Sequence, residues 1–437
     1  MDPLPIPDPT SSSQASLDAR SLRREKLYEF SMPVAIGLME GGFAAVVAAK
    51  AFDAPAWIIA VVSAAPMFGN LSSLLWSRLA AGRPKVALVL ALQALVVLCV
   101  AAIALSPRSN IGLGMLLVAV VLSRLVIAGI VTVRSVIWSL NYERSSRARS
   151  TARLQAITSL MFVLVMGIGA LVMDAHPESF RILYAVGVLC GCLGVWAYSG
   201  VEVRGERRQR VRERRDQRDE SGRSGFFGIL KTDKLYARYQ THQFIAGFAS
   251  MLIEPPLVYL VSKQIGASYF QSIGIVMLIP FLLYLATIQL WARWLDRVHV
   301  AEFRAKQNVL WVIGFLVMAW GAFTLSLVWL TVGRILAGVV SAGGSLAWQL
   351  GHNDFAPKEQ LSAYMAVHVT LTGLRGAIAP FLGMALYLGW GAGGPLPAFG
   401  GMGAGLFVLA ALGMVVAWRG FHLLHKDIQV SAAAQVD

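Results

Sequence analysis

The chain has 437 residues, of which 57% are hydrophobic and only 14% are charged. A soluble protein of this length needs more polar surface, so the composition indicates an integral membrane protein. The net charge of +14 does not indicate a nucleic-acid-binding protein, because the basic residues lie between apolar segments instead of gathering in one region. The three cysteines, Cys99, Cys190 and Cys192, lie inside apolar stretches, which argues against disulfides.

The chain begins with a segment rich in Pro, Ser and charge that lacks the apolar core of a secretory signal, and we expect a disordered cytoplasmic tail. Twelve apolar segments follow, each near the roughly 20 residues that span a bilayer. They are predicted at 30–51, 55–76, 86–105, 111–138, 155–174, 182–200, 241–262, 270–291, 308–326, 328–350, 363–389 and 398–418.

The longest hydrophilic stretch separates the sixth span from the seventh and reads as a solvated basic linker. The predicted fold is therefore all-helical and membrane-embedded, with two bundles of six helices. Its parts are a tail (1–27), the first bundle (28–200), the linker (201–239), the second bundle (240–420) and a second tail (421–437).

Basic residues are distributed unevenly between the two sides of the membrane. The segments on the side of both termini carry 30 of the 38 Lys and Arg residues, and the opposite side carries four. Positive loops face the cytoplasm, so both termini are predicted to be cytoplasmic and the protein to lie in the cell's inner membrane. The same distribution explains the basic charge without nucleic acid.

The second half of the sequence repeats the first at an offset of 210 to 215 residues. Glu40 matches Glu254, Pro66 matches Pro280, and further on Arg124, Ser135 and Trp138 match Arg334, Ser345 and Trp348. Each half has an even number of spans, so the halves are parallel repeats related by an axis along the membrane normal, as is common in secondary transporters.

The chain resembles the major facilitator superfamily over about residues 28–420. The family's basic loop after its second helix survives as Trp-Ser-Arg at 76–78 and Gly-Arg-Pro-Lys at 82–85, without its Asp. The second copy keeps Asp296-Arg297 but has His299 where Gly is usual. The span at 155–174 lacks the Gly-Pro antiporter signature, although Gly376 to Gly383 carries a related run. No subfamily is indicated.

Ionisable side chains inside the spans are candidates for function, because each is costly unless it is paired or faces water. The acids are Glu40 and Glu254, and the most central bases are Arg124, Arg334 and Arg375. The resemblance implies that the first, fourth, seventh and tenth spans line a central cavity. The Glu and Arg residues there either exchange partners when a proton or solute binds, or form static pairs that hold each bundle.

Other polar and aromatic residues are weaker candidates. Arg375 is a candidate anion-binding residue, and His368 on the same helix face is either a titrating group or a structural donor. Trp138 and Trp348 either gate the cavity or anchor at the interface. Further residues expected to line the cavity are Asn70, Gln243 and Ser250.

Charged residues at the predicted cytoplasmic ends fit the gate of the resembled family, in which acids and bases pair when that side is shut. Turn and helix-end roles explain them equally well. The candidates are Arg78, Arg83, Arg293, Asp296, Arg297, Glu143 and Asp354. His352 and Asp354 are too few ligands for a metal site.

The sequence predicts a secondary transporter of a small anionic, zwitterionic or amphipathic organic solute, coupled to protons and working by alternating access. The expected partners are this solute, protons and the lipid bilayer, and the protein is expected to be a monomer. No Walker loop, nucleophile elbow or haem motif occurs, so we expect neither an enzyme nor a cofactor. The alternative is a transporter-derived membrane sensor or scaffold that does not transport.

Overall fold

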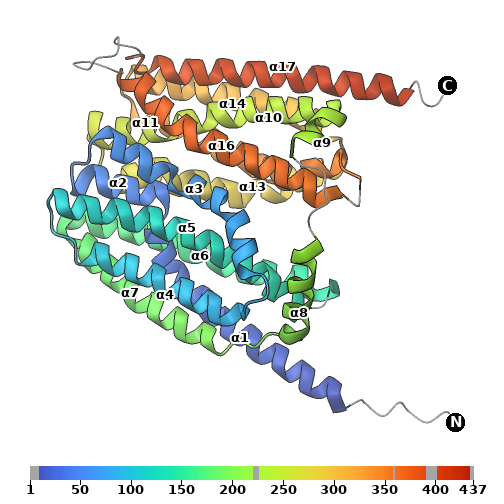
Figure 1. The fold of residues 1–437 in the computed structure, drawn as a ribbon. Coiled ribbons are helices and arrows are strands. Elements are labelled where there is room, and N and C mark those ends of the chain that lie inside the picture. The colour runs from blue at the N-terminus through green and yellow to red at the C-terminus, as the bar shows by residue number, and fades with distance from the viewer. Residues whose placement is uncertain (1–8, 143, 220–225, 358–359, 390–400, 434–437) are drawn as a thin grey trace. The chain divides into compact units, whose positions relative to one another are not determined.

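The computed structural model describes residues 9–142, 144–219, 226–357, 360–389 and 401–433, and every regular element in these ranges is helical (Figure 1). Ten helices here are long and apolar enough to cross a membrane, or eleven if the bent pair α1–α2 counts as one span. The remaining predicted span, 55–76, corresponds to α3 (Ala56–Ala80), whose shorter apolar stretch is Ala56–Ser72.

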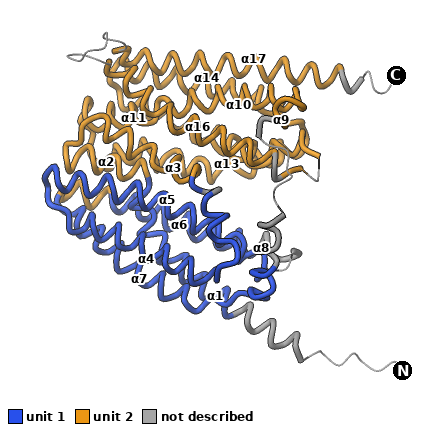
Figure 2. The backbone as a smooth tube through the Cα atoms, viewed as in Figure 1, with its two compact units in different colours: residues 1–40, 72–169, 178–222 blue, residues 41–71, 170–177, 223–437 orange. Residues whose placement is uncertain are grey.

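The chain divides into two compact units (Figure 2). The first comprises residues 1–40, 72–169 and 178–222. Its helices are α1 (Pro9–Leu38), α4 (Lys85–Ala104), α5 (Asn110–Asn141), most of α6 (Arg144–Ala175), α7 (Phe180–Ser199) and α8 (Glu206–Asp219).

Small residues let α7 approach α1 closely in the first unit. A Cβ at Gly194 would lie 2.8 Å from the Cβ of Met32, and one at Gly187 would lie 2.6 Å from Leu38. The Tyr184 hydroxyl donates to the Leu38 carbonyl at 2.8 Å, where α1 ends. Close backbone packing of this kind holds helices together in lipid, where the hydrophobic effect gives little help.

The second unit contains the remaining helices. They are α2 (Gly41–Ala51), most of α3, α9 (Phe226–Thr232), α10 (Lys234–Leu252), α11 (Glu254–Tyr259), α12 (Tyr269–Ile273), α13 (Ile279–Leu295), α14 (Val300–Phe323), α15 (Leu327–Leu350), α16 (Leu361–Leu388) and α17 (Gly405–Ala433). Single π-helical turns, Leu260–Gln264 and Gly274–Leu278, follow α11 and α12.

The units differ from the predicted bundles because 41–71 and 170–177 join the C-terminal part of the chain. The contacts explain this grouping. Lys263 pairs with Asp53 at 2.6 Å, and Asp174 accepts hydrogen bonds from the first residues of α12. These polar contacts fasten the two segments to the π-helical turn after α11 and to the start of α12.

Two segments predicted to lack regular structure contain helices. The helix α1 begins at Pro9, within the tail predicted at 1–27, and the linker predicted at 201–239 contains α8 and α9. The disorder expected for the whole N-terminal tail is therefore wrong for its described part. Hydropathy detects only the apolar part of a long helix, so the polar first part of α1 was not predicted.

We predict that Gly383→Ala destabilises the second unit. A Cβ at Gly383 on α16 would lie 1.7 Å from the carbonyl oxygen of Leu252, the last residue of α10, so the two backbones must separate. The expected fall in melting temperature of the detergent-purified protein is about 5 °C or more. Gly114→Ala on α5 is the control, because nothing lies within 4 Å of its added Cβ. Equal melting temperatures for the two variants would contradict this account of the contact.

Candidate functional site

The two acids predicted inside the spans stand at helix breaks. Glu40 lies between α1 and α2, which are bent by 45°, and Glu254 begins α11 directly after α10 ends. The two positions correspond in the sequence repeat. Breaks inside a membrane expose backbone groups and are typical of solute and ion sites in secondary transporters.

In the first unit, Glu40 pairs with Arg124 of α5, with 2.8 Å between Oε2 and Nη1. Both side chains remain partly exposed, by 22% and 15%. The Nε atom of Arg124 is buried without a hydrogen-bond partner in the described part of the chain. Arg124 therefore keeps donor capacity that its acid does not fill.

In the second unit, Glu254 pairs with Arg334 of α15 at 3.1 Å, and the other two guanidinium nitrogens of this arginine also have hydrogen-bond acceptors. Its Nε donates to the Ile275 carbonyl at 3.1 Å and its Nη2 to the Val276 carbonyl at 2.5 Å. All three nitrogens thus have acceptors.

The reason that these carbonyls need Arg334 lies in Pro280. Proline has no N–H, so it cannot serve the Val276 carbonyl in an α-helical turn or the Ile275 carbonyl in the π-helical turn. The guanidinium takes the place of the missing donor. Of the two predicted readings, this geometry favours the static pair for Glu254 and Arg334.

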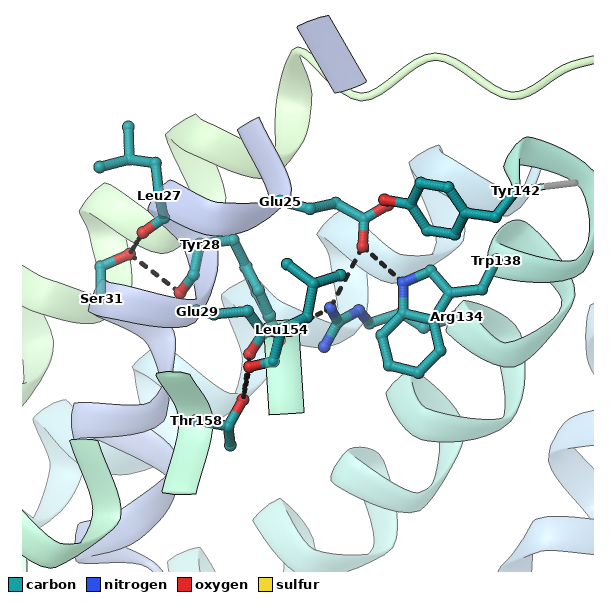
Figure 3. Close-up of polar contacts among 10 residues, drawn as sticks. All are labelled: Glu25, Leu27, Tyr28, Glu29, Ser31, Arg134, Trp138, Tyr142, Leu154 and Thr158. Carbon is teal, nitrogen blue, oxygen red and sulfur yellow. Dashed lines mark hydrogen bonds and ion pairs between the residues drawn. The ribbon is translucent and has the colours of Figure 1, made fainter. Parts of the chain in front are cut away.

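A second charged centre, which the sequence did not reveal, lies on α1 and α5. Arg134 contacts Glu29 directly through Nη2 and lies 3.6 Å from Oε2 of Glu25 (Figure 3). Glu25 is 0% exposed and Glu29 2%. With both acids ionised, the two carboxylates and one guanidinium carry one excess negative charge.

We call Arg134, Glu25 and Glu29 the Arg134 cluster, and neutral donors complete its hydrogen bonds (Figure 3). Trp138 Nε1 and the Tyr142 hydroxyl donate to Glu25 at 2.5 and 3.1 Å, and the Thr158 hydroxyl donates to Glu29 at 2.6 Å. The guanidinium also lies over the ring of Tyr28, 4.3 Å from its centroid. The predicted gate or anchor residue Trp138 is thus a hydrogen-bond donor to a buried acid.

A cavity of about 290 Å³ within the first unit connects the two charged centres. Helices α1, α5 and α6 line it. Glu40 with Arg124, and Glu29 with Arg134, contribute its charged walls; Trp138, Gln155, Thr158 and Phe162 contribute polar and aromatic ones. The cavity thus combines both signs of charge with aromatic surface.

In the second unit, α10, α15 and α16 bring most of the predicted polar residues together. Arg375 Nη1 donates to the Gln243 carbonyl at 2.6 Å, and Trp348 Nε1 donates to the Thr372 hydroxyl at 3.0 Å. His368 lies beside the Trp348 ring, with 5.3 Å between centroids.

Two of the predicted cavity residues have contacts within one turn of their own helix. Ser250 donates to the Gly247 carbonyl at 2.9 Å, one helical turn away, and the amide nitrogen of Asn70 lies 3.8 Å from the Met67 sulfur. Hydroxyl bonds to the preceding turn are common inside helices, so Ser250 gives no separate sign of a site.

The described gate candidates lie near helix ends or in the loops that join helices. Asp354 accepts from the backbone N–H of Val300 at 2.7 Å and so caps α14, which agrees with the helix-end reading. The side chains of the other described candidates are exposed, and Glu143 lies outside the described residues. The exposed ones are Arg78, Arg83, Arg293, Asp296 and Arg297.

The basic loop at 82–85 is instead held by the linker. Glu213 of α8 accepts from Lys85 Nζ at 2.6 Å and from the Gly82 N–H at 2.8 Å. Burial raises the pKa of the Glu213 carboxyl, but these hydrogen bonds outweigh burial and leave its pKa below the usual value. The linker, expected to be solvated, is docked at this point.

We predict that Arg334→Lys destabilises the protein more than Arg124→Lys, although the two positions are counterparts in the repeat. A lysine cannot reach Glu254 and two carbonyls together, so buried carbonyls lose their donor at about 1–3 kcal/mol each. Arg124 has a single bonded nitrogen to replace. Melting temperatures in detergent decide the ranking, and the reverse order would refute the static assignment.

We also predict that Arg134→Gln is strongly destabilising, by about 3–5 kcal/mol, because it leaves two buried carboxylates without a cation. Adding Glu25→Gln and Glu29→Gln to the same chain removes both charges and should recover much of the lost stability. Thermal unfolding of the single and triple variants measures this. A triple variant less stable than Arg134→Gln would show that the three side chains do not act as one charged unit.

Residues 241–432 match the sequence model of the Major Facilitator Superfamily. No curated protein sequence matches the chain.

Solved structures match nearly the whole fold. A variant of the nucleoside transporter NupG is 12% identical with a TM-score of 0.71, covering 92% of this chain and 99% of its own. The D-xylose-proton symporter is 12% identical with a TM-score of 0.66, covering 92% and 97%. The peptide transporter POT in complex with sulfate is 13% identical with a TM-score of 0.68, covering 94% and 95%.

These identities are too low to carry a substrate from one protein to another, but the shared fold is extensive. The sequence match of the C-terminal half agrees with the fold match of the whole chain, as expected from the motifs at 76–85 and 296–297. The chain therefore has the fold of these transporters, and its C-terminal part matches the sequence model of the Major Facilitator Superfamily.

Proposed function

We propose that this chain couples the movement of protons to that of a small organic solute, with the coupling centre in its first unit. The Arg134 cluster is the observation that carries this proposal. Two carboxylates share one guanidinium in a buried place, so one excess negative charge remains when both are ionised. Burying a net charge in a membrane protein is costly, and binding one proton removes it.

Glu25 is the residue that we propose takes the proton. Arg134 contacts Glu29 directly but lies 3.6 Å from Glu25, whose hydrogen-bonding partners are neutral. A hydroxyl both donates and accepts, so the Tyr142 hydroxyl, which donates to the carboxylate, can accept from the carboxylic acid. Glu25 therefore has suitable partners in both protonation states.

Arg134 links proton binding to the cavity. When Glu25 is neutral, the guanidinium is attracted by Glu29 alone, and its balance of contacts at the cavity wall changes. Arg124, with its incompletely used donors, lines the same cavity beside Glu40. Proton binding at one end thus alters the electrostatic environment of a solute at the other.

The cavity supports the solute class predicted from the sequence. Its volume of about 290 Å³ lies at the lower end for small-molecule sites, and its walls combine both charge signs with the rings of Trp138 and Phe162. These features suit an anionic, zwitterionic or amphipathic organic molecule. From the 30 of 38 basic residues on one side, we further infer that the protein lies in the inner membrane with cytoplasmic termini. We also propose that it works as a monomer.

The test measures proton-driven uptake and solute exchange in proteoliposomes, using the solute that most raises the melting temperature in a screen. Glu25→Gln mimics the protonated acid permanently. We expect it to lose at least about tenfold of uptake driven by a pH gradient while retaining exchange of labelled for unlabelled solute. Exchange needs no net proton transfer, so its survival separates lost coupling from lost folding.

Glu178→Gln is the matched control, because Glu178 pairs with Arg108 at an exposed loop. It should keep both activities. Proton-driven uptake unchanged in Glu25→Gln would overturn the coupling proposal. If the wild-type protein moves no solute in either assay, the sensor or scaffold alternative is favoured instead.

A further inference from the structure

Two buried arginines in the second unit have no acid paired with them among the residues that the structure describes. Arg304 on α14 is 5% exposed and Arg375 on α16 is 4% exposed. In the described part of the chain neither forms an ion pair, whereas Arg334 in the same unit pairs with Glu254. An unbalanced buried cation is costly.

The contacts of both guanidinium groups are with neutral atoms. Arg375 donates from Nη1 to the Gln243 carbonyl, and Arg304 donates from Nη1 to Gln307 Oε1 at 2.9 Å. A longer contact of 3.4 Å joins Arg304 Nη2 to the Gly344 carbonyl. The Nε atoms of both arginines are buried without a hydrogen-bond partner in the described chain.

Further polar atoms beside these arginines are also unsatisfied. His368 Nδ1 lies 3.0 Å from Gln240 Oε1, which leaves His368 Nε2 and the amide nitrogen of Gln240 unpaired among described residues. Both side chains are only 2% exposed. Buried polar groups in folded proteins are nearly always hydrogen-bonded, so this group of unused donors is unusual.

Local packing holds Arg375 in place. A Cβ at position 247 would lie 2.1 Å from its Cζ atom, so the guanidinium occupies the space left by Gly247. The neighbouring His368 side chain is held in the same way, because the Trp348 ring lies against it and Trp348 Nε1 is fixed by Thr372. The unused donors are therefore positioned by rigid helices and not by flexible loops.

We propose that Arg304, Arg375 and Gln240, which we call the two-arginine site, bind a dianionic oxyanion, a dicarboxylate or a phosphate monoester, within the second unit and separately from the cavity of the first unit. Two positive charges and the three unused donors Arg304 Nε, Arg375 Nε and Gln240 Nε2 match the charge and acceptor atoms of such a group. The proposal goes beyond the proposed transport function and does not depend on it. Arg304 is a residue that the sequence did not single out.

The test is thermal unfolding of the full-length protein in detergent with succinate, citrate, inorganic phosphate or phenyl phosphate, against sodium chloride of equal ionic strength and neutral succinamide. We expect a saturable rise in melting temperature with carboxylates or phosphates, and the effective pair identifies the source of the oxyanion. Arg304→Gln and Arg375→Gln should each weaken the apparent affinity about tenfold to a hundredfold. The control Arg419→Gln changes an exposed arginine on α17 that belongs to no proposed site, and it should leave the affinity unchanged.

Stability without ligand separates a binding role from a bracing role. Removing an unbalanced cation should leave the ligand-free melting temperature of Arg375→Gln unchanged or higher, whereas loss of a structural brace would lower it. Arg375→Lys keeps the charge without the fork of donors and should bind more weakly than wild type. A lower ligand-free melting temperature together with undiminished anion binding would overturn the proposal, as would wild-type protein stabilised by none of the four anions.

The two proposals fail separately. Anion binding in detergent requires no proton gradient, so a saturable anion response with normal proton-driven uptake in Glu25→Gln would remove the coupling proposal alone. Loss of coupling in Glu25→Gln without any anion response in the wild type would remove the two-arginine site alone.

Discussion

A guanidinium group inside a membrane must find acceptors for its nitrogens, and this requirement organises the polar interior of the chain. Arg334 meets it with an acid and two carbonyls that Pro280 cannot serve. Arg134 meets it with two acids, and so leaves an excess negative charge. Arg304 and Arg375 meet it only with neutral acceptors. The same physical demand thus gives one stable brace, one centre suited to protons and one suited to anions.

The repeat is symmetric in sequence but not in energetics. Both halves place a glutamate at a helix break opposite an arginine, yet Arg334 has all of its nitrogens occupied and Arg124 does not. The difference originates near Pro280, where a π-helical turn leaves carbonyls for Arg334 to bind. A duplicated pair can therefore keep its geometry while only one copy retains the capacity to bind something else.

Most of the fold could be predicted from the sequence because long apolar segments have one stable arrangement in lipid. The pairs of Glu40 with Arg124 and Glu254 with Arg334 followed from their equivalent positions in the repeat. Glu25, Glu29 and Arg304 were not identified, because hydropathy placed the spans at 30–51 and 308–326. The helices continue beyond those limits through polar turns, and burial there depends on neighbouring helices that one sequence does not reveal.

The close approach of Arg375 to Gly247 links two positions far apart in the sequence. Any side chain at 247 would occupy the volume that the guanidinium fills, so the two residues must change together. Related chains that carry a larger residue at the position equivalent to 247 should therefore lack the arginine. Because that arginine supplies half of the positive charge at the two-arginine site, a glycine at this position should mark relatives that share the proposed anion site.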